Sequence, residues 1–370
     1  MFKKSLVIAL VIMFAFSGVA LADEANYRDS YTLSYNVAPG FPWGMTVEYF
    51  VDEVEERTDG RIEINAVGGS ELAGGDQTEV FSMVRAGAID MAIESTINIS
   101  PQIPAMNLFS LPFFFDGYED LDAVLEGQAG EMLIEEMEDM GVVGVGWGEN
   151  GFREFTNNVR PVHSPEDMSD LSFRVVGSEI YIDIFHELGA DPLTMPWGEA
   201  TTGFEQGTVD GQENPILGVQ IPTYIWEFHE YLTIWNYLAD PLVFFTNEGV
   251  FNTFTEEDQE ILLEAADDAL EFGRMLTRYN LDDGTAKEYI DEMIETGEDR
   301  GYAENYLDEI RLDDGEIDPI AYLEEQGMQV NELTEEEREV FEEETEGVYD
   351  EWIPRIGEDI YEAALEDMGR

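Results

Sequence analysis

The sequence predicts an α/β protein of two domains, each with a mostly parallel sheet covered by helices. Strand-like and helix-like segments alternate between residues 31 and 94, and the same alternation begins again after Gly151. This alternation is typical of βαβ units, whose strands pair side by side. The chain has 370 residues, of which 44% are hydrophobic. That length and composition supply enough apolar material for two such domains.

The first run of elements occupies the sequence up to Glu94. The segment 42–58 repeats apolar residues at helical spacing and ends before Gly60, which favours a helix that stops at the glycine. Residues 61–67, RIEINAV, alternate apolar and polar side chains as a half-buried strand does. The expected order is strand 31–37, helix 42–58, strand 61–67, helix 77–85 and strand 89–94.

The second run is followed by a helical C-terminal region. Its expected elements are strand 171–176, helix 179–188, helix 198–206 and strand 208–211. Thr255 is a predicted N-cap followed by acids in the first turn, and a long apolar stripe extends from Leu262 to Leu276. The glutamates at 335–337 and 342–344 are expected on solvated helix faces, not at metal sites.

The charge balance is strongly negative. The chain has 83 Asp and Glu against 17 Lys and Arg, a formal net charge of -66, and Lys3, Lys4 and Lys287 are its only lysines. Such a charge repels phosphate, so nucleic acids and anionic membrane surfaces are excluded as partners. Molar salt shortens the Debye length to roughly 3 Å and screens the repulsion, so we hypothesise a halophilic origin. A local acidic tail or patch is the alternative, but the acids run through the whole chain.

Familiar catalytic and cofactor motifs are missing. The chain has no cysteine, which excludes disulfides, thiol nucleophiles and cysteine-ligated zinc. None of its three histidines has metalloprotease spacing, and no serine-hydrolase elbow occurs. Residues 146–151 fit the pattern G-x-G-x-x-G, but the following FREFTNNVRP does not begin a helix, so we interpret them as a glycine-rich crossover. The sequence therefore predicts no catalytic residue, no metal ligand and no cofactor.

The N-terminus has the pattern of an export signal. Residues 1–22 begin with two lysines, continue with an apolar run and end in Ala-Leu-Ala. We expect cleavage after Ala22, an exported mature chain beginning at Asp23 and a periplasmic location. An uncleaved membrane anchor is the alternative, although the apolar run is short for a span.

Two arginine segments stand out in so acidic a chain. Arg153 lies in GFREFTNN and Arg174 in LSFRV. A guanidinium suits a planar, bidentate grip on a carboxylate. Structural ion pairs with the many acids are the alternative for any single arginine.

At these residues the sequence resembles the DctP-type solute receptors of TRAP transporters. The similarity covers essentially the whole mature chain in order, and it is much more specific than a short motif. It is carried by GFREFTNNVRPV (151–162), PEDMSDLSFRVV (165–176), LGADPLTMPWGEA (188–200) and QGTVDGQENP (206–215), and upstream by SELAGGD (70–76), GAIDMA (87–92) and LPFFF (111–115).

The resemblance implies a two-lobed fold of the periplasmic-binding-protein type, a Venus flytrap with crossing hinge strands and a long connecting helix. Lobe I is expected over residues 23–150 and about 240–279, and lobe II over residues 151–239 and about 280–370. The protein would be a monomeric receptor that closes over a small organic acid and delivers it to separate TRAP membrane subunits. Closure would exclude water and strengthen local charge-assisted hydrogen bonds.

The resemblance also implies a set of ligand-binding residues. Arg174 occupies the position of the family's signature arginine, which forms a salt bridge with the ligand carboxylate. The other residues implied are Asn214, which holds the same carboxylate, Arg153, the second arginine of many carboxylate-binding members, and further Asn36, Asp76, Glu94 and Trp197.

Two departures from the family pattern and two rival functions stay open. The segment 295–319 is longer than usual, and PWGEATTGF (196–204) replaces the more usual aromatic pattern of the pocket wall. The rivals are an exported hydrolase with two carboxylates across the cleft and a receptor of another importer or a sensor. C4-dicarboxylates, 2-oxo acids, sugar acids and aromatic acids are all compatible with the sequence.

Overall fold

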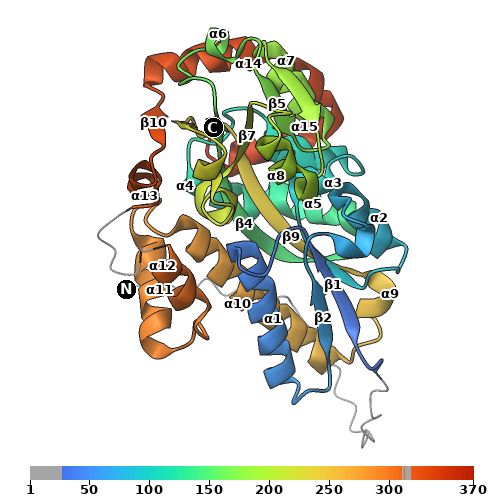
Figure 1. Ribbon diagram of the computed structural model, residues 1–370. Coiled ribbons are helices and arrows are strands. Elements are labelled where there is room, and N and C mark those ends of the chain that lie inside the picture. The colour runs from blue at the N-terminus through green and yellow to red at the C-terminus, as the bar shows by residue number, and fades with distance from the viewer. Residues whose placement is uncertain (1–26, 311, 313–317) are drawn as a thin grey trace, which may run out of the picture.

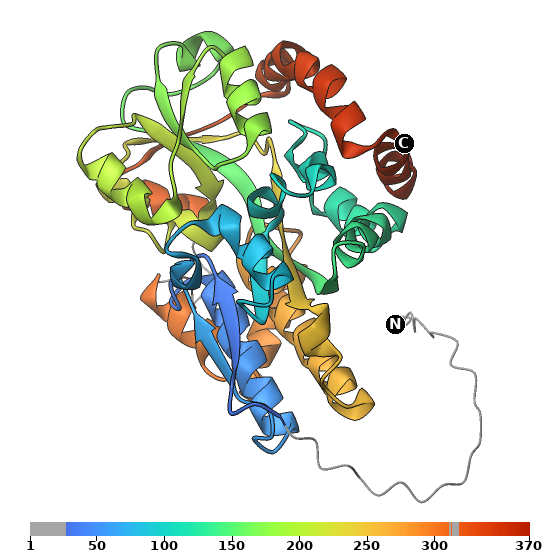
Figure 2. The same cartoon turned by 90° about the vertical axis from the view of Figure 1, so that its right-hand side faces the viewer.

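A computed structural model of the chain describes residues 27–310, 312 and 318–370. The expected signal peptide, and residues 311 and 313–317 of the long segment 295–319, lie outside the described residues. The described residues form two lobes, one above the other in Figure 1, that are joined by long central strands. Figure 2 shows the same arrangement from the side.

The two lobes share a mixed sheet of ten strands. Its main path has the order β2-β1-β3-β9-β4-β7-β5-β6, and β8 pairs with β4 and β10. The strands are β1 (Tyr31–Tyr35), β2 (Ile64–Val67), β3 (Met91–Ser95), β4 (Val142–Asn157), β5 (Ser172–Val175), β6 (Asp191–Thr194), β7 (Gly211–Pro215), β8 (Tyr231–Ile234), β9 (Ala239–Asn247) and β10 (Gln329–Glu332).

The sequence predicts a mostly parallel sheet in each domain, and the structure has one mixed sheet in which the parallel pairs, β8 with β10 included, occur beside antiparallel ones. β1, β2 and β3 are parallel to one another, and so are β5, β6 and β7. Between these sets, β9 pairs antiparallel with β3 and with β4, and β4 pairs antiparallel with β7. The sixteen-residue β4 pairs with β9 in one lobe and with β7 and β8 in the other, so it crosses between the lobes. Both βαβ runs were predicted, whereas the antiparallel strands between them were not.

Helices cover both faces of the sheet. In the lower lobe α10 packs on α1, β4 and α11, and in the upper lobe α14 packs on α7 and on the 3-10 segment 104–110. The helices are α1 (Pro42–Arg57), α2 (Val80–Arg85), α3 (Thr96–Ile99), α4 (Tyr118–Leu125), α5 (Gln128–Glu138), α6 (Pro165–Met168), α7 (Glu179–Glu187), α8 (Trp197–Glu205), α9 (Glu248–Phe251), α10 (Glu256–Arg278), α11 (Thr285–Thr296), α12 (Tyr302–Glu309), α13 (Pro319–Glu325), α14 (Glu335–Ile356) and α15 (Glu358–Asp367).

Several local predictions are confirmed. α1 and α7 match their predicted ranges within one residue, and the Thr255 hydroxyl accepts the backbone N–H of Asp258 as an N-cap does. The glutamates at 342–344 are exposed on α14, and those at 335–337 form its first turn. The lobe boundaries expected from the sequence stay a prediction.

The strand predicted over residues 208–211 is misplaced. β7 begins at Gly211 and continues through the polar sequence GQENP, all of it buried. Gly207 has a positive φ of 62° and ends the turn after α8, while the Asp210 carboxylate accepts the Ser172 backbone N–H at 2.9 Å. These polar residues form a strand because β4 and β5 pair with them on both sides.

The glycine-rich segment 146–151 lies inside β4 and begins no helix. A Cβ on Gly146 or on Gly148 would lie 2.9 Å from a methyl carbon of Leu270 on α10. The glycines therefore allow the long helix to approach the crossing strand, as the interpretation of a glycine-rich crossover requires. Within the described ranges, the helices lack the length and apolarity needed to cross a bilayer.

Candidate ligand-binding site

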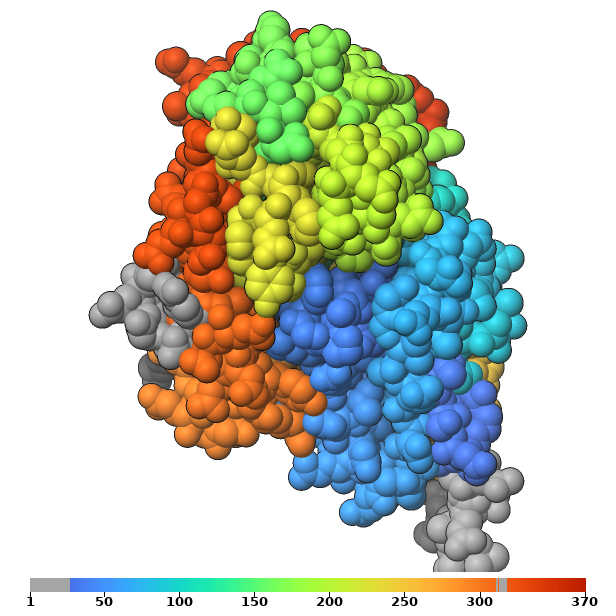
Figure 3. Space-filling view, viewed as in Figure 1, coloured from blue at the N-terminus to red at the C-terminus, as the bar shows by residue number. Residues whose placement is uncertain are grey.

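A pocket lies where the two lobes meet, beside the crossing strands. The space between its walls is about 330 Å³, open solvent included, and segments from both sequence runs line it. Figure 3 shows the corresponding surfaces, residues near 40–80 and near 180–210, in contact along the boundary between the lobes. The lining residues are Asn36, Val37, Trp43, Gln77, Ser95, Ile97, Asn98, Asn150, Arg153, Arg174, Val176, Trp197, Asn214, Val219 and Asp240.

Arg174 is a buried cation without an acidic partner among the described residues. It extends from β5, is 1% exposed and donates from Nε to the Met195 carbonyl at 3.0 Å. Its Nη2 is buried and has no hydrogen-bond partner. Burial lowers the pKa of Arg174 to about 10, and nearby Glu213 only partly opposes this effect. A buried guanidinium with an unpaired donor facing a pocket is suited to receive an anionic group.

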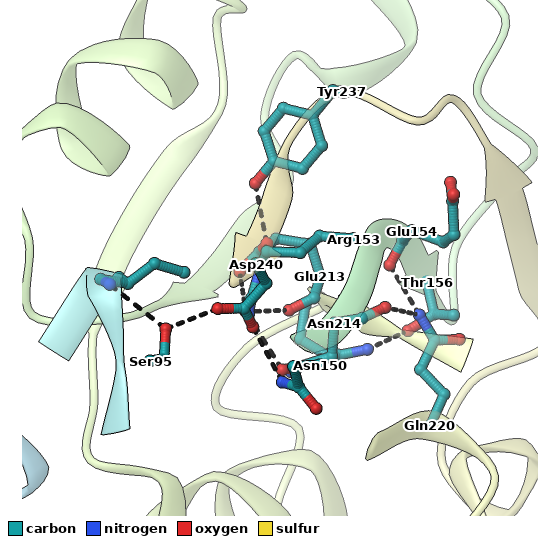
Figure 4. A network of polar contacts seen from close by, with 12 residues as sticks. Ser95, Asn150, Arg153, Glu154, Thr156, Glu213, Asn214, Gln220, Tyr237 and Asp240 are labelled. Carbon is teal, nitrogen blue, oxygen red and sulfur yellow. Dashed lines mark hydrogen bonds and ion pairs between the residues drawn. The ribbon is translucent and has the colours of Figure 1, made fainter. Parts of the chain in front are cut away.

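Arg153 lies in the same pocket, but acids already surround it (Figure 4). Nε and Nη2 donate to the Glu213 carboxylate, Nη1 donates to Asp240 at 2.5 Å, and Nη2 also contacts Asn214 Oδ1 at 3.1 Å. Burial opposes the charge of this guanidinium, yet Glu213, Tyr181 and Asp240 hold the pKa of Arg153 well above its usual value. Arg153 is therefore a cation whose charge is balanced inside the protein.

Asn214 lies beside Arg153 on β7 and is supported from behind by a chain of buried polar groups. Its Nδ2 donates to Gln212, whose Nε2 donates to the Thr156 hydroxyl at 2.7 Å. That hydroxyl is 2.9 Å from Nδ1 of His229. Burial lowers the pKa of His229 to about 3, so the ring is neutral. The chain fixes the orientation of the Asn214 amide.

Of the remaining predicted residues, Asn36 and Trp197 line the pocket. Asn36 follows β1, and its Oδ1 accepts the Ser70 hydroxyl at 3.2 Å. The guanidinium carbon of Arg174 lies 5.4 Å from the centroid of the Trp197 ring, which places an aromatic face beside the unpaired cation. The role of Trp197 as a wall of the ligand site stays a prediction.

Glu94 and Asp76 lie outside the pocket lining. Glu94 is completely buried on β3, and its Oε2 accepts the amide of Asn98, a lining residue, at 2.7 Å. Burial raises the pKa of Glu94 well above its usual value. The Asp76 carboxylate accepts the Thr78 backbone N–H at 3.0 Å and caps a short 3-10 turn. Glu94 therefore contacts the pocket only through Asn98, and Asp76 is the N-cap of a short 3-10 turn.

A hydrogen bond crosses between the lobes at the pocket. Gln77 Oε1 accepts the Trp197 backbone N–H at 2.9 Å, and Gln77 Nε2 donates to Asn98 Oδ1, on its own side of the pocket, at 2.9 Å. Outside the pocket lining, the hydroxyl oxygens of Ser100 and Ser178 lie 2.9 Å apart. These contacts hold the lobes together.

Sequence reasoning missed several residues of the site, above all Asp240, Glu213 and Gln77. Asp240 carried a signal, because it is the one charged residue in the apolar run 237–245 and should be buried there. Glu213 lies within the quoted segment QENP but was not singled out among so many acids. Gln77 carried no signal, because it lies in a polar stretch before α2.

The family of the chain follows from comparison with known proteins. Residues 33–298 match the DctP family, described as bacterial extracellular solute-binding protein, family 7. This chain belongs to the DctP family. The match runs from within β1 past β9 and includes every pocket residue named above.

Similar proteins of known structure and function include other receptors of this kind. A TRAP periplasmic solute-binding protein from Ralstonia eutropha with bound (S)-2-acetolactate is 38% identical, with a TM-score of 0.81 over 93% of this chain and 99% of that one. The 2,3-diketo-L-gulonate-binding periplasmic protein YiaO of Escherichia coli is 31% identical over 80% of this chain and 86% of its own length. The sugar acid binding protein DctPAm from Advenella mimigardefordensis, in complex with galactonate, is 26% identical, with a TM-score of 0.76 over 92% of this chain and 97% of that one.

These likenesses establish the two-lobed fold and the class of protein. The DctP-family chain is a TRAP-type periplasmic solute receptor of the kind that binds carboxylates. The pocket between its lobes contains the unpaired guanidinium of Arg174.

Proposed function

We propose that this receptor captures a small organic acid between its lobes, with Arg174 as the anchor for the ligand carboxylate. The observation that carries the proposal is the buried guanidinium of Arg174, which faces the pocket without an acidic partner in the described part of the chain. A carboxylate supplies both the charge and the acceptor oxygens that this group lacks. Asn214 and Asn36 offer neutral polar contacts, and Trp197 covers one side of the guanidinium. Glu94 supports the wall through Asn98, and Asp76 shapes the turn before Gln77.

The proposal includes export, assembly and the absence of catalysis. The chain is cleaved after Ala22, acts as a periplasmic monomer and delivers its ligand to separate TRAP membrane subunits. The family name and the relatives' printed functions support this assignment. Release of the bound acid chemically unchanged is the expected behaviour of a receptor, and turnover would favour the hydrolase alternative. Sequencing the N-terminus of the mature protein tests the cleavage site. Measuring its molecular mass in solution tests whether it is a monomer.

Thermal unfolding with a panel of ligands tests the binding function. Small carboxylic acids should raise the unfolding midpoint of residues 23–370 by several degrees, because a ligand that binds only the native state stabilises it. The primary amide of each acid is the control, since it keeps the shape and removes the charge. A midpoint that rises with the amides as much as with the acids would contradict the anchoring role of a cation.

We also propose that the protein comes from a salt-rich environment. The support is the net charge of -66 together with the scarcity of lysine. Its unfolding midpoint should rise strongly between 0.1 M and 2 M KCl, because molar salt screens the repulsion among the carboxylates. A neutral osmolyte at equal osmolarity is the control for general solvent effects. An equal midpoint in both salt concentrations would contradict the proposal.

A further inference from the structure

The charges of the pocket balance before any ligand arrives. Two guanidinium groups, Arg153 and Arg174, face it, and two buried carboxylates, Glu213 and Asp240, accompany them. Both carboxylates pair with Arg153, and neither pairs with Arg174. Arg153 therefore has two carboxylate partners, whereas Arg174 has no ion-pair partner among the described residues. Arg174 is the guanidinium that can pair with a ligand.

Asp240 is held in the acceptor role, which is the role of an ionised carboxylate. It receives hydrogen bonds from Arg153 Nη1 at 2.5 Å, from Asn150 Nδ2 at 2.8 Å and from the Ser95 hydroxyl at 2.5 Å. The Ser95 oxygen itself accepts the Ile97 backbone N–H, so its own proton points to Asp240. A carboxylate that only accepts, with a guanidinium among its donors, is negatively charged. Figure 4 shows Asp240 between Ser95, Asn150 and Arg153.

A second ligand carboxylate has no favourable place in this pocket. The first carboxylate pairs with Arg174, the one guanidinium of the pocket that has no ion-pair partner among the described residues. A second one would have to approach Arg153, where Glu213 already takes Nε and Nη2 and Asp240 takes Nη1. It would lie near the negative charge of Asp240 in a water-poor site, and juxtaposed like charges are costly there.

The rest of the lining suits uncharged oxygen and carbon groups. Amide side chains from both lobes reach the pocket and offer neutral donors and acceptors. Small apolar side chains and two large rings, Trp43 and Trp197, complete the wall. The amide residues are Asn36, Gln77, Asn98, Asn150 and Asn214, and the apolar ones include Val37, Trp43, Ile97, Val176 and Val219.

From this arrangement we infer that the ligand is a small hydroxy- or oxo-monocarboxylic acid, and that Asp240 is the residue that excludes dicarboxylic acids. The inference rests on the proposed function, because it takes Arg174 as the anchor of the first carboxylate. Asp240 acts in two ways, by neutralising Arg153 and by repelling a second carboxylate. It is a specificity-determining residue of the receptor.

Matched pairs of acids that differ only at the far end test the inference. Suitable pairs are 2-hydroxybutanoate with malate, 2-oxopentanoate with 2-oxoglutarate, and gluconate with glucarate, titrated by calorimetry in molar salt. In every pair that binds, the wild-type protein should prefer the monocarboxylate by at least about tenfold, the scale expected for an unpaired like charge. Asp240→Asn keeps the shape and removes the charge, so it should reduce that preference by about tenfold or reverse it.

Asp122→Asn is the matched control. It also removes one carboxylate from a buried arginine, here Arg278, but outside the pocket lining. The preference should stay as in the wild type. If Asp240→Asn does not fold, the wild-type comparison decides alone, and equal or tighter binding of the dicarboxylates overturns the inference.

The outcomes separate this inference from the proposed function. If the wild type binds neither member of any pair, and no other carboxylate in the thermal panel, the proposed function fails. If it binds dicarboxylates tightly and this binding depends on Arg174, the proposed function stands and the role of Asp240 is wrong. An unchanged preference in a folded Asp240→Asn variant also overturns the role of Asp240.

Discussion

Replacing Arg174 by methionine should abolish carboxylate binding without destabilising the protein. The guanidinium is buried and lacks an acidic partner among the described residues, so its removal deprives the ligand of its counter-ion. Truncating one partner of a buried charge pair costs roughly 2–5 kcal/mol. The same change removes a buried charge that the unliganded fold does not compensate, so the free energy of unfolding should stay equal or increase. Calorimetric titration and denaturant unfolding, both in molar salt, measure the two effects.

A conservative variant and a control sharpen this prediction. Arg174→Lys should also lose most of the affinity, because an ammonium group is a point charge and cannot reproduce the planar fork. Arg160→Met is the control, since Arg160 is half-buried, follows β4 and does not line the pocket. Affinity close to that of the wild type in either Arg174 variant would contradict the assignment of the anchor.

The elements of the fold that depend only on neighbouring residues in the sequence were predictable. The N-cap at Thr255 and the apolar stripe of α10 depend on residues a few positions apart, and both are as expected. The C-terminal half of β4 and the whole of β7 depend on distant partners instead. Their glycines, asparagines and proline favour turns when isolated. The two segments become strands because they pair with each other and bury a polar network.

The candidate site divides in the same way. Arg174 and Asn214 could be chosen only because their segments resemble a family, since spacing alone gives no arginine a role. The choice of Glu213 and Asp240 as the partners of Arg153 was not predictable, because 83 acids offer far too many pairings. The arginines could be singled out because the chain has few cations. The acidic partners of each arginine could not be chosen, because the chain has so many carboxylates.

The largest loss of stability should follow from replacing Arg278 by methionine. Arg278 ends α10 and donates to Glu149 of the crossing strand, with Nε 3.0 Å from both carboxylate oxygens. It also pairs with Asp122 of α4 at 2.6 and 2.8 Å and covers the ring of Tyr118 at 4.3 Å. A single side chain thus ties the long helix to the strand that joins the lobes.

The expected cost of Arg278→Met is about 3–5 kcal/mol in the free energy of unfolding, because Glu149 is fully buried and would lose its counter-ion. Burial already raises the pKa of Glu149 while Arg278 lowers it, so without the arginine the cost of holding a charge there is uncompensated. Denaturant unfolding in molar salt measures the loss.

Two further variants separate the charge effect from lost packing. Arg278→Met combined with Glu149→Leu removes both charges and should recover most of the stability, since an apolar pair of similar volume is often as stable as a buried ion pair. Arg355→Met breaks an exposed pair with Glu351 on α14 and should cost less than about 1 kcal/mol. If the double variant is as unstable as Arg278→Met alone, packing against Tyr118 is the main contribution of Arg278. The buried charge pair would then not be what stabilises the junction of α10 and β4.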